Sequence, residues 1–210
     1  MDQELEDYIL DHISPEPQLL TETYRYTNIH HLYPRMCSGH IQGRLLKMLT
    51  AMVAPRRVVE LGCYTGYSTL CIAEGMAPEG ELHTIEVDDE LLDELTARFG
   101  QSPYGERIHL HIGDALEILP TLEGGWDMAF VDANKRNYVE YLDLLLPQMN
   151  PGGFILADNT LWSGKVVDPA SHDPQTQAIR RFNDYVARHP RLETAIIPLR
   201  DGLTLLRVKS

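Results

Sequence analysis

The sequence predicts an α/β protein with a doubly wound, mostly parallel sheet of seven strands, the last of which is antiparallel. From Val58 onward, short apolar runs alternate with helical stretches, as in parallel strands joined by crossover helices. The runs are almost continuously apolar, as expected for strands buried on both faces. Asp201-Gly202 is a hairpin signal before the last run, so the final strand should reverse direction. The strand candidates are Val58–Leu61, Glu81–Glu86, Ile108–Ile112, Met128–Val131, Phe154–Ala157, Glu193–Ile197 and Thr204–Val208.

Helices are expected between these strands and in the N-terminal part of the chain. Leu5, Ile9 and Ile13 recur at helical spacing near the start of the sequence. We expect the whole chain to form one domain, with residues 1–54 as a helical cap on an α/β core of residues 55–210. The clearest helical candidates within the core are Ser68–Met76, Glu90–Phe99 and Asn137–Gln148.

The charge balance argues against a large anionic partner. Acidic residues outnumber basic residues by 31 to 18, which gives a formal net charge of −13. The average surface should repel nucleic acid and anionic membranes, so a small molecule is the expected substrate. The chain begins with an acidic stretch rather than a basic signal sequence, and its apolar runs are too short to span a membrane. We therefore expect a cytoplasmic protein.

A glycine-rich turn follows the first strand candidate, within Val58–Ser68. Glycine lets the backbone approach a ligand closely, and the helix that begins here offers free N–H groups. Gly62 and Gly66 have the spacing G-x-x-x-G, which differs from the dinucleotide-binding pattern G-x-G-x-x-G. Glu60 would repel a pyrophosphate but suits a cationic amino-acid ligand such as S-adenosylmethionine. The alternative is an ordinary strand-to-helix turn.

The ends of the next two strand candidates favour a ligand that contains a nucleoside. Glu86 ends the second candidate, 24 residues after Gly62, where ribose hydroxyls are bound in nucleotide-binding sheets. Asp114 and Ala115 follow the third candidate, where the turn would lie over adenine. Asp114 is equally suited to cap the following helix, and the two roles are compatible.

Three oxygen donors follow the fourth and fifth strand candidates. Asp132 comes after the fourth, and Asp158-Asn159 comes at the end of the fifth. Neighbouring parallel strands end at the same edge of a sheet, so these side chains should surround one point. Hard oxygen ligands suit a cation such as Mg²⁺, and Lys135 lies beside them in the sequence. The alternative for Asp158-Asn159 is a solvated turn.

Together these segments resemble the cation-dependent O-methyltransferases, a family that includes catechol and caffeoyl-coenzyme A O-methyltransferases and small bacterial members. The resemblance extends from about Met36 to the C-terminal hairpin, and D-N-x-L-W-x-G at Asp158–Gly164 is its most specific part. It implies a Rossmann-like fold and methyl transfer from S-adenosylmethionine to a hydroxyl group. It also implies a divalent cation, Mg²⁺ before Mn²⁺ or Ca²⁺. Bacterial relatives are commonly homodimers, so we expect a homodimer here.

The resemblance implies a role for each matching residue. Asp132, Asp158 and Asn159 match the metal ligands, and Lys135 with Asp132 matches the catalytic centre. The N-terminal segment should close over the methyl donor. The residues expected in the S-adenosylmethionine pocket are Met36, Ser38, Glu60, Gly62, Tyr64, Ser68, Glu86, Asp114, Ala115 and Asp132.

The expected substrate is a small aromatic molecule with two vicinal hydroxyls that chelate the cation. In this hypothesis the cation lowers the pKa of one hydroxyl, Lys135 accepts or orients its proton, and the oxyanion attacks the methyl group. Asn134 stands where the family often has aspartate, so we expect a tuned function with the metal ligands kept. Trp162 and Tyr138 are candidates to line an aromatic substrate, with packing as the equal alternative.

Two other functions remain open from the sequence. Some bacterial relatives methylate a hydroxylated wobble uridine in tRNA, and Arg180-Arg181 with Arg188 would be a local basic patch for that partner. The other is a non-catalytic protein that binds S-adenosylmethionine or metal as a sensor. His109 and His111 lack the context of a metal site, so we expect structural or surface roles for them.

Overall fold

The computed structural model describes residues 3–209, which contain the expected seven-stranded sheet. The strand order is β3-β2-β1-β4-β5-β7-β6. Neighbours from β3 to β5 are parallel, whereas β7 is antiparallel to both β5 and β6. This confirms the predicted fold class, including the reversed last strand. The strands are β1 (Arg57–Leu61), β2 (Glu81–Glu86), β3 (Ile108–Ile112), β4 (Trp126–Val131), β5 (Met149–Asp158), β6 (Leu192–Ile197) and β7 (Leu203–Val208).

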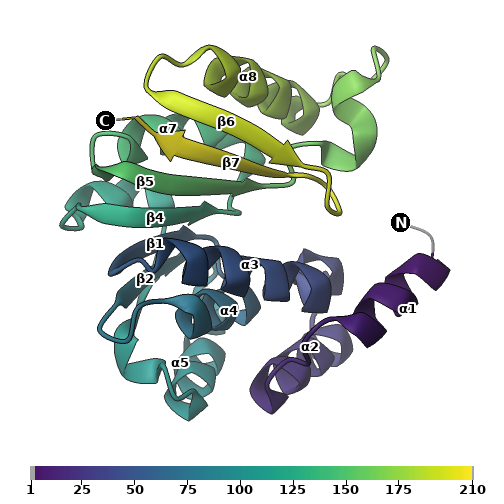
Figure 1. Ribbon diagram of the computed structural model, residues 1–210, viewed down its shortest axis with the longest axis vertical. Helices are drawn as coiled ribbons and strands as arrows, with labels where there is room; N and C mark the ends of the chain where they lie inside the picture. Colours follow the sequence, from purple (N-terminus) through teal and green to yellow (C-terminus); the bar gives the residue numbers. More distant parts are fainter. Residues whose placement is uncertain (1–2, 210) are drawn as a thin grey trace.

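Helices cover both faces of the sheet (Figure 1). They are α1 (Gln3–His12), α2 (Gln18–His30), α3 (Gly39–Val53), α4 (Tyr67–Gly75), α5 (Leu92–Gln101), α6 (Ala115–Ile118), α7 (Tyr138–Leu145) and α8 (Pro174–Arg188). Successive strand residues face opposite sides: Val58 belongs to the core formed with α3, α4 and α5, and Val59 belongs to the core formed with α6, α7 and α8. The continuous apolar runs therefore follow from a sheet with a core on each face.

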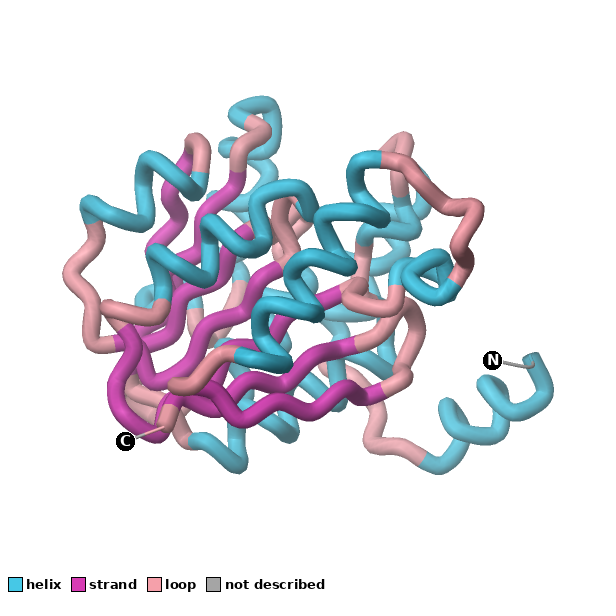
Figure 2. The backbone as a smooth tube through the Cα atoms, turned by 90° about the horizontal axis from the view of Figure 1, so that it is seen from above, coloured by secondary structure: helices cyan, strands magenta, loops and turns pink. Residues whose placement is uncertain are grey.

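Helices α1 and α2 lie toward the carboxyl ends of the strands, whereas α3 belongs to the helical layer on one face of the sheet. Helix α1 has no buried residue and extends away from the body in two views (Figures 1 and 2). Helix α2 is anchored by Thr27, whose Oγ1 donates to Oγ1 of Thr65 over 2.9 Å in the turn after β1. Among residues 3–209, no helix is both long enough and apolar enough to cross a membrane.

Strand β5 begins five residues earlier than the predicted run Phe154–Ala157. Asn150 explains the extension, because its Nδ2 donates to the carbonyl of Gly125 over 2.9 Å and to Oδ1 of Asp127 over 2.7 Å. These bonds hold the irregular start of β5 against β4, where the pairing register shifts. Proline and glycine at this point are typical of a turn, so the sequence pattern concealed the longer strand.

Candidate functional site

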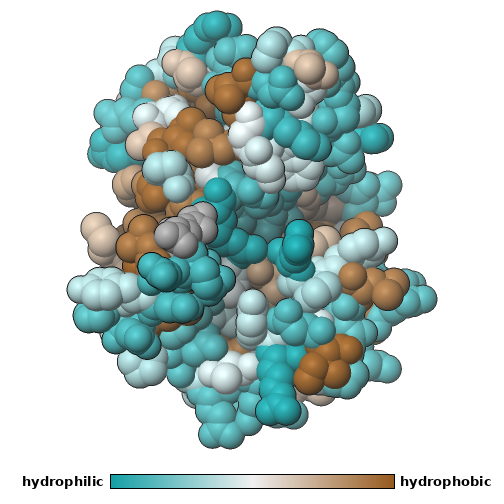
Figure 3. Space-filling view, turned by 90° about the vertical axis from the view of Figure 1, so that its right-hand side faces the viewer, coloured by the Kyte–Doolittle hydropathy of each residue, from teal (hydrophilic) through white to brown (hydrophobic). Residues whose placement is uncertain are grey.

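One large cavity lies at the carboxyl ends of the parallel strands and is lined by most of the predicted site residues. Its volume is about 740 Å³. Figure 3 views the molecule from the side toward which these strand ends point, and mainly hydrophilic residues surround the recess in its centre. The predicted residues that line the cavity are Met36, Ser38, Gly62, Tyr64, Ser68, Glu86, Asp114, Ala115, Asp132, Lys135, Asp158 and Asn159.

The glycine turn brings strands β1 and β4 together at the floor of this cavity. Gly62 has a φ of +85°, and a Cβ atom there would lie 2.6 Å from the carbonyl oxygen of Asp132. Gly66 has a φ of +82°, and its Cβ would lie 2.7 Å from the ring of Phe99. Both positions therefore require glycine, for conformation and for space. The turn leads directly into α4, whose second residue, Ser68, lines the cavity.

Glu86 ends β2 with its carboxylate held in place by backbone N–H groups. Its Oε2 accepts from the N–H of Tyr64 over 2.6 Å, and its Oε1 accepts from those of Val87 and Asp88 over 2.9 and 3.1 Å. Each carboxylate oxygen has two lone pairs, so these three bonds leave capacity for a ligand donor. The geometry suits the predicted contact with ribose hydroxyls.

Glu60 is the one predicted pocket residue that does not line the cavity. It is fully buried beneath the turn, where its Oε2 accepts from Oγ1 of Thr69 over 2.5 Å and from Oγ1 of Thr84 over 2.7 Å. Burial raises the pKa of this carboxyl to about 7. The side chain of Glu60 bonds to Thr69 and Thr84 beneath the cavity and does not line it. Direct contact between Glu60 and a bound ligand therefore stays a prediction.

Three roles left open by the sequence are clearer in the structure. Asp114 caps α6, since its carboxylate accepts from the N–H of Leu116 over 2.9 Å, and it also lines the cavity. Tyr138 belongs to the core, where its hydroxyl donates to the carbonyl of Asp158 over 2.9 Å. Trp162 is partly exposed and lines the cavity, so it is available to an aromatic ligand.

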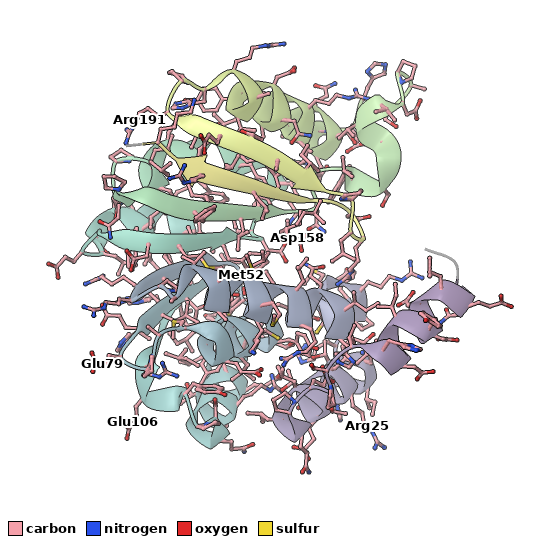
Figure 4. The ribbon with its side chains drawn as sticks, in the orientation of Figure 1. Arg25, Met52, Glu79, Glu106, Asp158 and Arg191 are labelled. Atoms are coloured by element: carbon pink, nitrogen blue, oxygen red, sulfur yellow. The ribbon has the colours of Figure 1, made fainter. Side chains whose placement is uncertain are left out.

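The carboxylates of Asp132 and Asp158 meet at the ends of β4 and β5. Val131 pairs with Ala157 in the register of these strands, so the residues that follow are neighbours. Asp158 is 4% exposed, and its Oδ1 accepts from the backbone N–H of Asn159 over 2.7 Å. Asn159 has a φ of +58°, a left-handed conformation that asparagine tolerates better than most residues. Figure 4 shows Asp158 between the strand end and helix α3.

The electrostatics of this pair fit a bound cation. Burial and the neighbouring Asp132 raise the pKa of Asp158 to about 6. Two carboxylate groups and the amide oxygen of Asn159 are the hard donors that Mg²⁺, Mn²⁺ or Ca²⁺ prefer. The described residues therefore supply a donor set that suits a divalent cation.

Lys135 lies beside the carboxylates as predicted. Its ammonium pairs with Oδ1 of Asp132 and lies 5.1 Å from the ring centroid of Tyr138. Asn134, the position that departs from the family pattern, accepts at Oδ1 from the N–H of Arg136 over 3.2 Å. It thereby caps the 3₁₀ turn Lys135–Asn137, a local role that asparagine and aspartate both perform.

Arg200 and Gln42 are residues at this site that the sequence reasoning missed. Arg200 lines the cavity and donates to the carbonyls of Arg35, Cys37 and Ser38. The hairpin between β6 and β7 is thus tied to the segment that carries the predicted residues Met36 and Ser38. These contacts join residues more than 160 positions apart, for example Arg200 and Ser38 at a separation of 162, and no local pattern predicts them.

The three arginines considered as a basic patch for tRNA make separate contacts. Arg180 donates to the carbonyls of Lys165, Val166 and Ser171 over 2.7 to 2.9 Å, so its guanidinium is occupied in holding the loop before α8. Arg181 and Arg188 are exposed. Nη2 of Arg181 is 3.9 Å from one carboxylate oxygen, and Nη2 of Arg188 is 3.5 Å from another. Arg180 keeps its charge but supports a loop, and a shared patch for tRNA stays a prediction.

Comparisons with known proteins agree on one family. A family model described as O-methyltransferase matches residues 11–209. A caffeoyl-CoA O-methyltransferase of Stellaria longipes is 31% identical over 98% of this chain and 90% of the relative. Caffeoyl-CoA O-methyltransferase 2 of Zea mays is 34% identical over 97% of this chain and 82% of the relative.

Solved structures lead to the same family. The O-methyltransferase TomG of Streptomyces achromogenes, in complex with SAM, has a TM-score of 0.92 and 30% identity, with complete coverage of both chains. The O-methyltransferase of Bacillus cereus, in complex with SAH, has a TM-score of 0.91 and 28% identity, covering 98% of this chain and 97% of the other.

Proposed function

Since the chain belongs to the O-methyltransferase family, we propose that this S-adenosylmethionine-dependent enzyme methylates one hydroxyl of a small vicinal dihydroxy aromatic with the help of a divalent cation. One observation carries the proposal. The Asp132–Lys135 pair lies in the same cavity as Asp158, Asn159 and the glycine turn at Gly62. A proton-accepting group, hard oxygen ligands and a methyl-donor pocket thus surround one space.

The metal part of the proposal rests on the donor set. Asp132, Asp158 and Asn159 would hold the cation, which we expect to be Mg²⁺ with Mn²⁺ or Ca²⁺ as substitutes. The cation, when bound, would lower the pKa of a coordinated hydroxyl and stabilise the oxyanion. The protein fixes the orientation of these donors: backbone and side-chain bonds hold Asp158, and the turn after β4 holds Asp132.

Lys135 is proposed to receive or orient the proton that the acceptor hydroxyl loses. Its ammonium is directed at Asp132 by their ion pair, so it lies beside the carboxylate that would hold the cation. To act as a base it must first release its own proton, which a nearby positive charge favours. Lys135 then keeps the proton of the acceptor hydroxyl, so that the oxyanion is free to take the methyl group.

The donor part of the proposal rests on the glycine turn and Glu86. Gly62 lets the backbone come close to the donor, and the N-terminal turn of α4 with Ser68 offers polar groups to its amino-acid end. Glu86 would accept from the ribose hydroxyls, with Asp114 and Ala115 beside the adenine. Tyr64, Met36 and Ser38 line the cavity and would help to exclude water from the reaction. Most of the rate enhancement would come from positioning, which contributes about 7–11 kcal/mol in well-oriented systems.

The choice of a catechol-like acceptor has support from two sources. Relatives in Stellaria longipes and Zea mays are named for caffeoyl-CoA, whose aromatic ring carries two vicinal hydroxyls. Trp162 is partly exposed and lines the cavity, so it offers aromatic surface to such a ring. A homodimer and a cytoplasmic location, both expected from the sequence, stay predictions.

The test is a methyl-transfer assay with a matched panel of acceptors. Catechols and caffeoyl esters should be methylated in the presence of Mg²⁺, and monohydroxy analogues that cannot chelate should react far more slowly. Chelator should abolish the reaction, and added Mg²⁺ or Mn²⁺ should restore it. Full activity in chelator, or equal rates on the monohydroxy analogues, would contradict the metal-chelation mechanism. Methylation of hypomodified tRNA in place of the diphenols would contradict the substrate class.

A further inference from the structure

A second group of potential metal ligands lies at the end of the sheet opposite the cavity. Glu81 and His83 belong to β2, and His109 and His111 belong to β3 (β2 is labelled in Figure 1). His83 pairs with His109 in the strand register, and alternate residues share a face, so all four side chains are on one side of the sheet. Glu86, at the cavity end of β2, is five residues away from Glu81, which corresponds to about 16 Å of strand.

Three of these residues approach the geometry of a tetrahedral metal site. The ligand atoms of Glu81, His83 and His109 all lie within 4.8 Å of one another. Nε2 of His83 is 3.7 Å from Oε1 of Glu81, and Nε2 of His109 is 3.8 Å from Oε2 of the same carboxylate. Ligands bound to Zn²⁺ at about 2.0–2.1 Å in a tetrahedron are about 3.3–3.5 Å apart. The ligand atoms would therefore have to approach one another by at most about 1.5 Å to complete the site.

His111 holds His83 in the orientation that such a site needs. Nδ1 of His83 lies 3.1 Å from Nε2 of His111, and the two rings are stacked with an interplanar angle of 9°. Nε2 of His83 is buried and has no hydrogen-bond partner among residues 3–209. A hydrogen bond at one ring nitrogen determines which nitrogen offers its lone pair, as it does around metal-bound histidines. The unpartnered Nε2 faces the carboxylate of Glu81, where a cation would satisfy it.

We propose that Glu81, His83 and His109 bind a transition-metal cation of the Zn²⁺ class, with His111 as a positioning residue. Two imidazoles and one carboxylate are a donor set that Zn²⁺, Co²⁺, Ni²⁺ and Cu²⁺ favour, in contrast to the all-oxygen set in the cavity. The side chain of His109 is 45% exposed, so the ion has access from solvent and water can be the fourth ligand. This proposal goes beyond the expectation from the sequence that His109 and His111 have structural or surface roles.

Arg57 opposes metal binding at this site and so offers a further test. Its Nη1 is 3.0 Å from Oε1 of Glu81, and its guanidinium lies 5.0 Å from the ring centroid of Trp126. The positive charge repels a cation and competes with it for the carboxylate of Glu81. Removal of that charge should strengthen binding, whereas a simple structural role for the histidines predicts no such effect.

The test is a titration of the metal-free full-length protein with Co²⁺ in the presence of excess Mg²⁺. The Mg²⁺ keeps the oxygen ligands in the cavity occupied, and four-coordinate Co²⁺ with imidazole ligands absorbs visible light. The wild-type protein should develop visible bands that saturate at one equivalent of Co²⁺ and disappear when Zn²⁺ is added. The thermal midpoint should rise with metal concentration, because the folded state is the one that binds. A wild-type protein without these bands would overturn the proposal.

Substitutions then locate the ion. His109→Ala, at an exposed position that should tolerate the change, is expected to abolish the bands, and His172→Ala is the matched exposed control that keeps them. His111→Ala should weaken the affinity by about 10- to 100-fold at unchanged stoichiometry. Arg57→Gln should tighten binding. Identical spectra and affinities for His109→Ala and the wild type would contradict the assignment. Methyl transfer should be the same in both proteins, because His109 is remote from the cavity.

Discussion

Gln42 donates from its Nε2 to Oδ2 of Asp158 over 2.6 Å, and this bond joins helix α3 to the end of strand β5. Both side chains are buried, with exposures of 2% and 4%. Oε1 of Gln42 in turn accepts from Nη1 of Arg200 over 3.3 Å. The proposed metal ligand Asp158 is thus oriented by a residue 116 positions earlier in the chain, which is itself oriented by the C-terminal hairpin.

The bond between Gln42 and Asp158 should govern metal affinity. Gln42→Ala removes the donor that orients the carboxylate, so the Mg²⁺ concentration for half-maximal activity should rise by about 10- to 100-fold. The rate at saturating Mg²⁺ should change much less. Gln18→Ala is the control, because Gln18 is an exposed helical glutamine whose side chain donates to Glu22 and lies outside the cavity. An unchanged Mg²⁺ dependence in Gln42→Ala, at an intact thermal midpoint, would contradict this role.

Lys135 should affect the chemical step and not donor binding. Lys135→Ala should lower kcat by about 10²- to 10⁴-fold, the usual contribution of a positioned acid or base. The affinity for S-adenosylmethionine, measured by calorimetry, should stay close to that of the wild type. Lys165→Ala is the control, since Lys165 is an exposed lysine outside the cavity. A normal kcat in Lys135→Ala would remove this residue from the mechanism.

Gly62 should be required for space as well as for conformation. Gly62→Ala places a Cβ 2.6 Å from the backbone oxygen of Asp132, so strands β1 and β4 must separate at the cavity floor. Gly152→Ala is the matched control, because its φ of +82° is similar but no atom lies within 4 Å of its Cβ. The control should lose only about 1–2 kcal/mol of unfolding free energy, the cost of a left-handed alanine.

The difference between the two glycine variants separates the clash from the backbone conformation. Gly62→Ala should lose more unfolding free energy than Gly152→Ala and should also bind S-adenosylmethionine more weakly. Chemical denaturation and calorimetry measure the two effects. Equal losses in both variants, with normal donor binding, would show that the close approach to Asp132 is unimportant.

Glu60 should make the stability of the ligand-free protein depend on pH. Its pKa is raised by burial from 4.5 to about 7 in the folded state. Between these values the folded state holds a proton that the unfolded state has lost, so the free energy of unfolding should fall as pH rises through this window. The contribution of Glu60 to the free energy of unfolding is fully present below pH 4.5 and is lost as the pH rises past about 7. Its size is on the order of 3 kcal/mol, because each pKa unit corresponds to about 1.4 kcal/mol.

Glu60→Gln provides the comparison for this pH effect. Glutamine cannot ionise, so the difference in unfolding free energy between the variant and the wild type should shift in favour of the variant as pH rises from 4.5 to 8. Denaturant unfolding at a series of pH values measures that difference. A difference that is constant over this range would show that Glu60 titrates normally in the folded state.

Much of the fold and most of the cavity lining could be predicted from local patterns. The alternation of apolar runs and helices determined the class, and the Asp201-Gly202 turn determined the reversal of β7. Gly62, Glu86, Asp132 and Asp158 were found because each follows or ends a strand, and parallel strands bring such residues to one edge. The position of a residue that ends or follows a strand can therefore be predicted from the sequence.

Only the tertiary structure decided which distant residues support or surround the proposed metal ligands. The contacts of Asp158 with Gln42 and of Arg200 with Ser38 span 116 and 162 positions, and they depend on how the N-terminal helices pack on the strand ends. Cross-strand register likewise brought His83 and His109 together. The sequence by itself determined the strand ends at Asp132 and Asp158, because a strand end is a local feature of apolar spacing. The packing of separate elements decided their partners, because nothing in either local segment specifies the other.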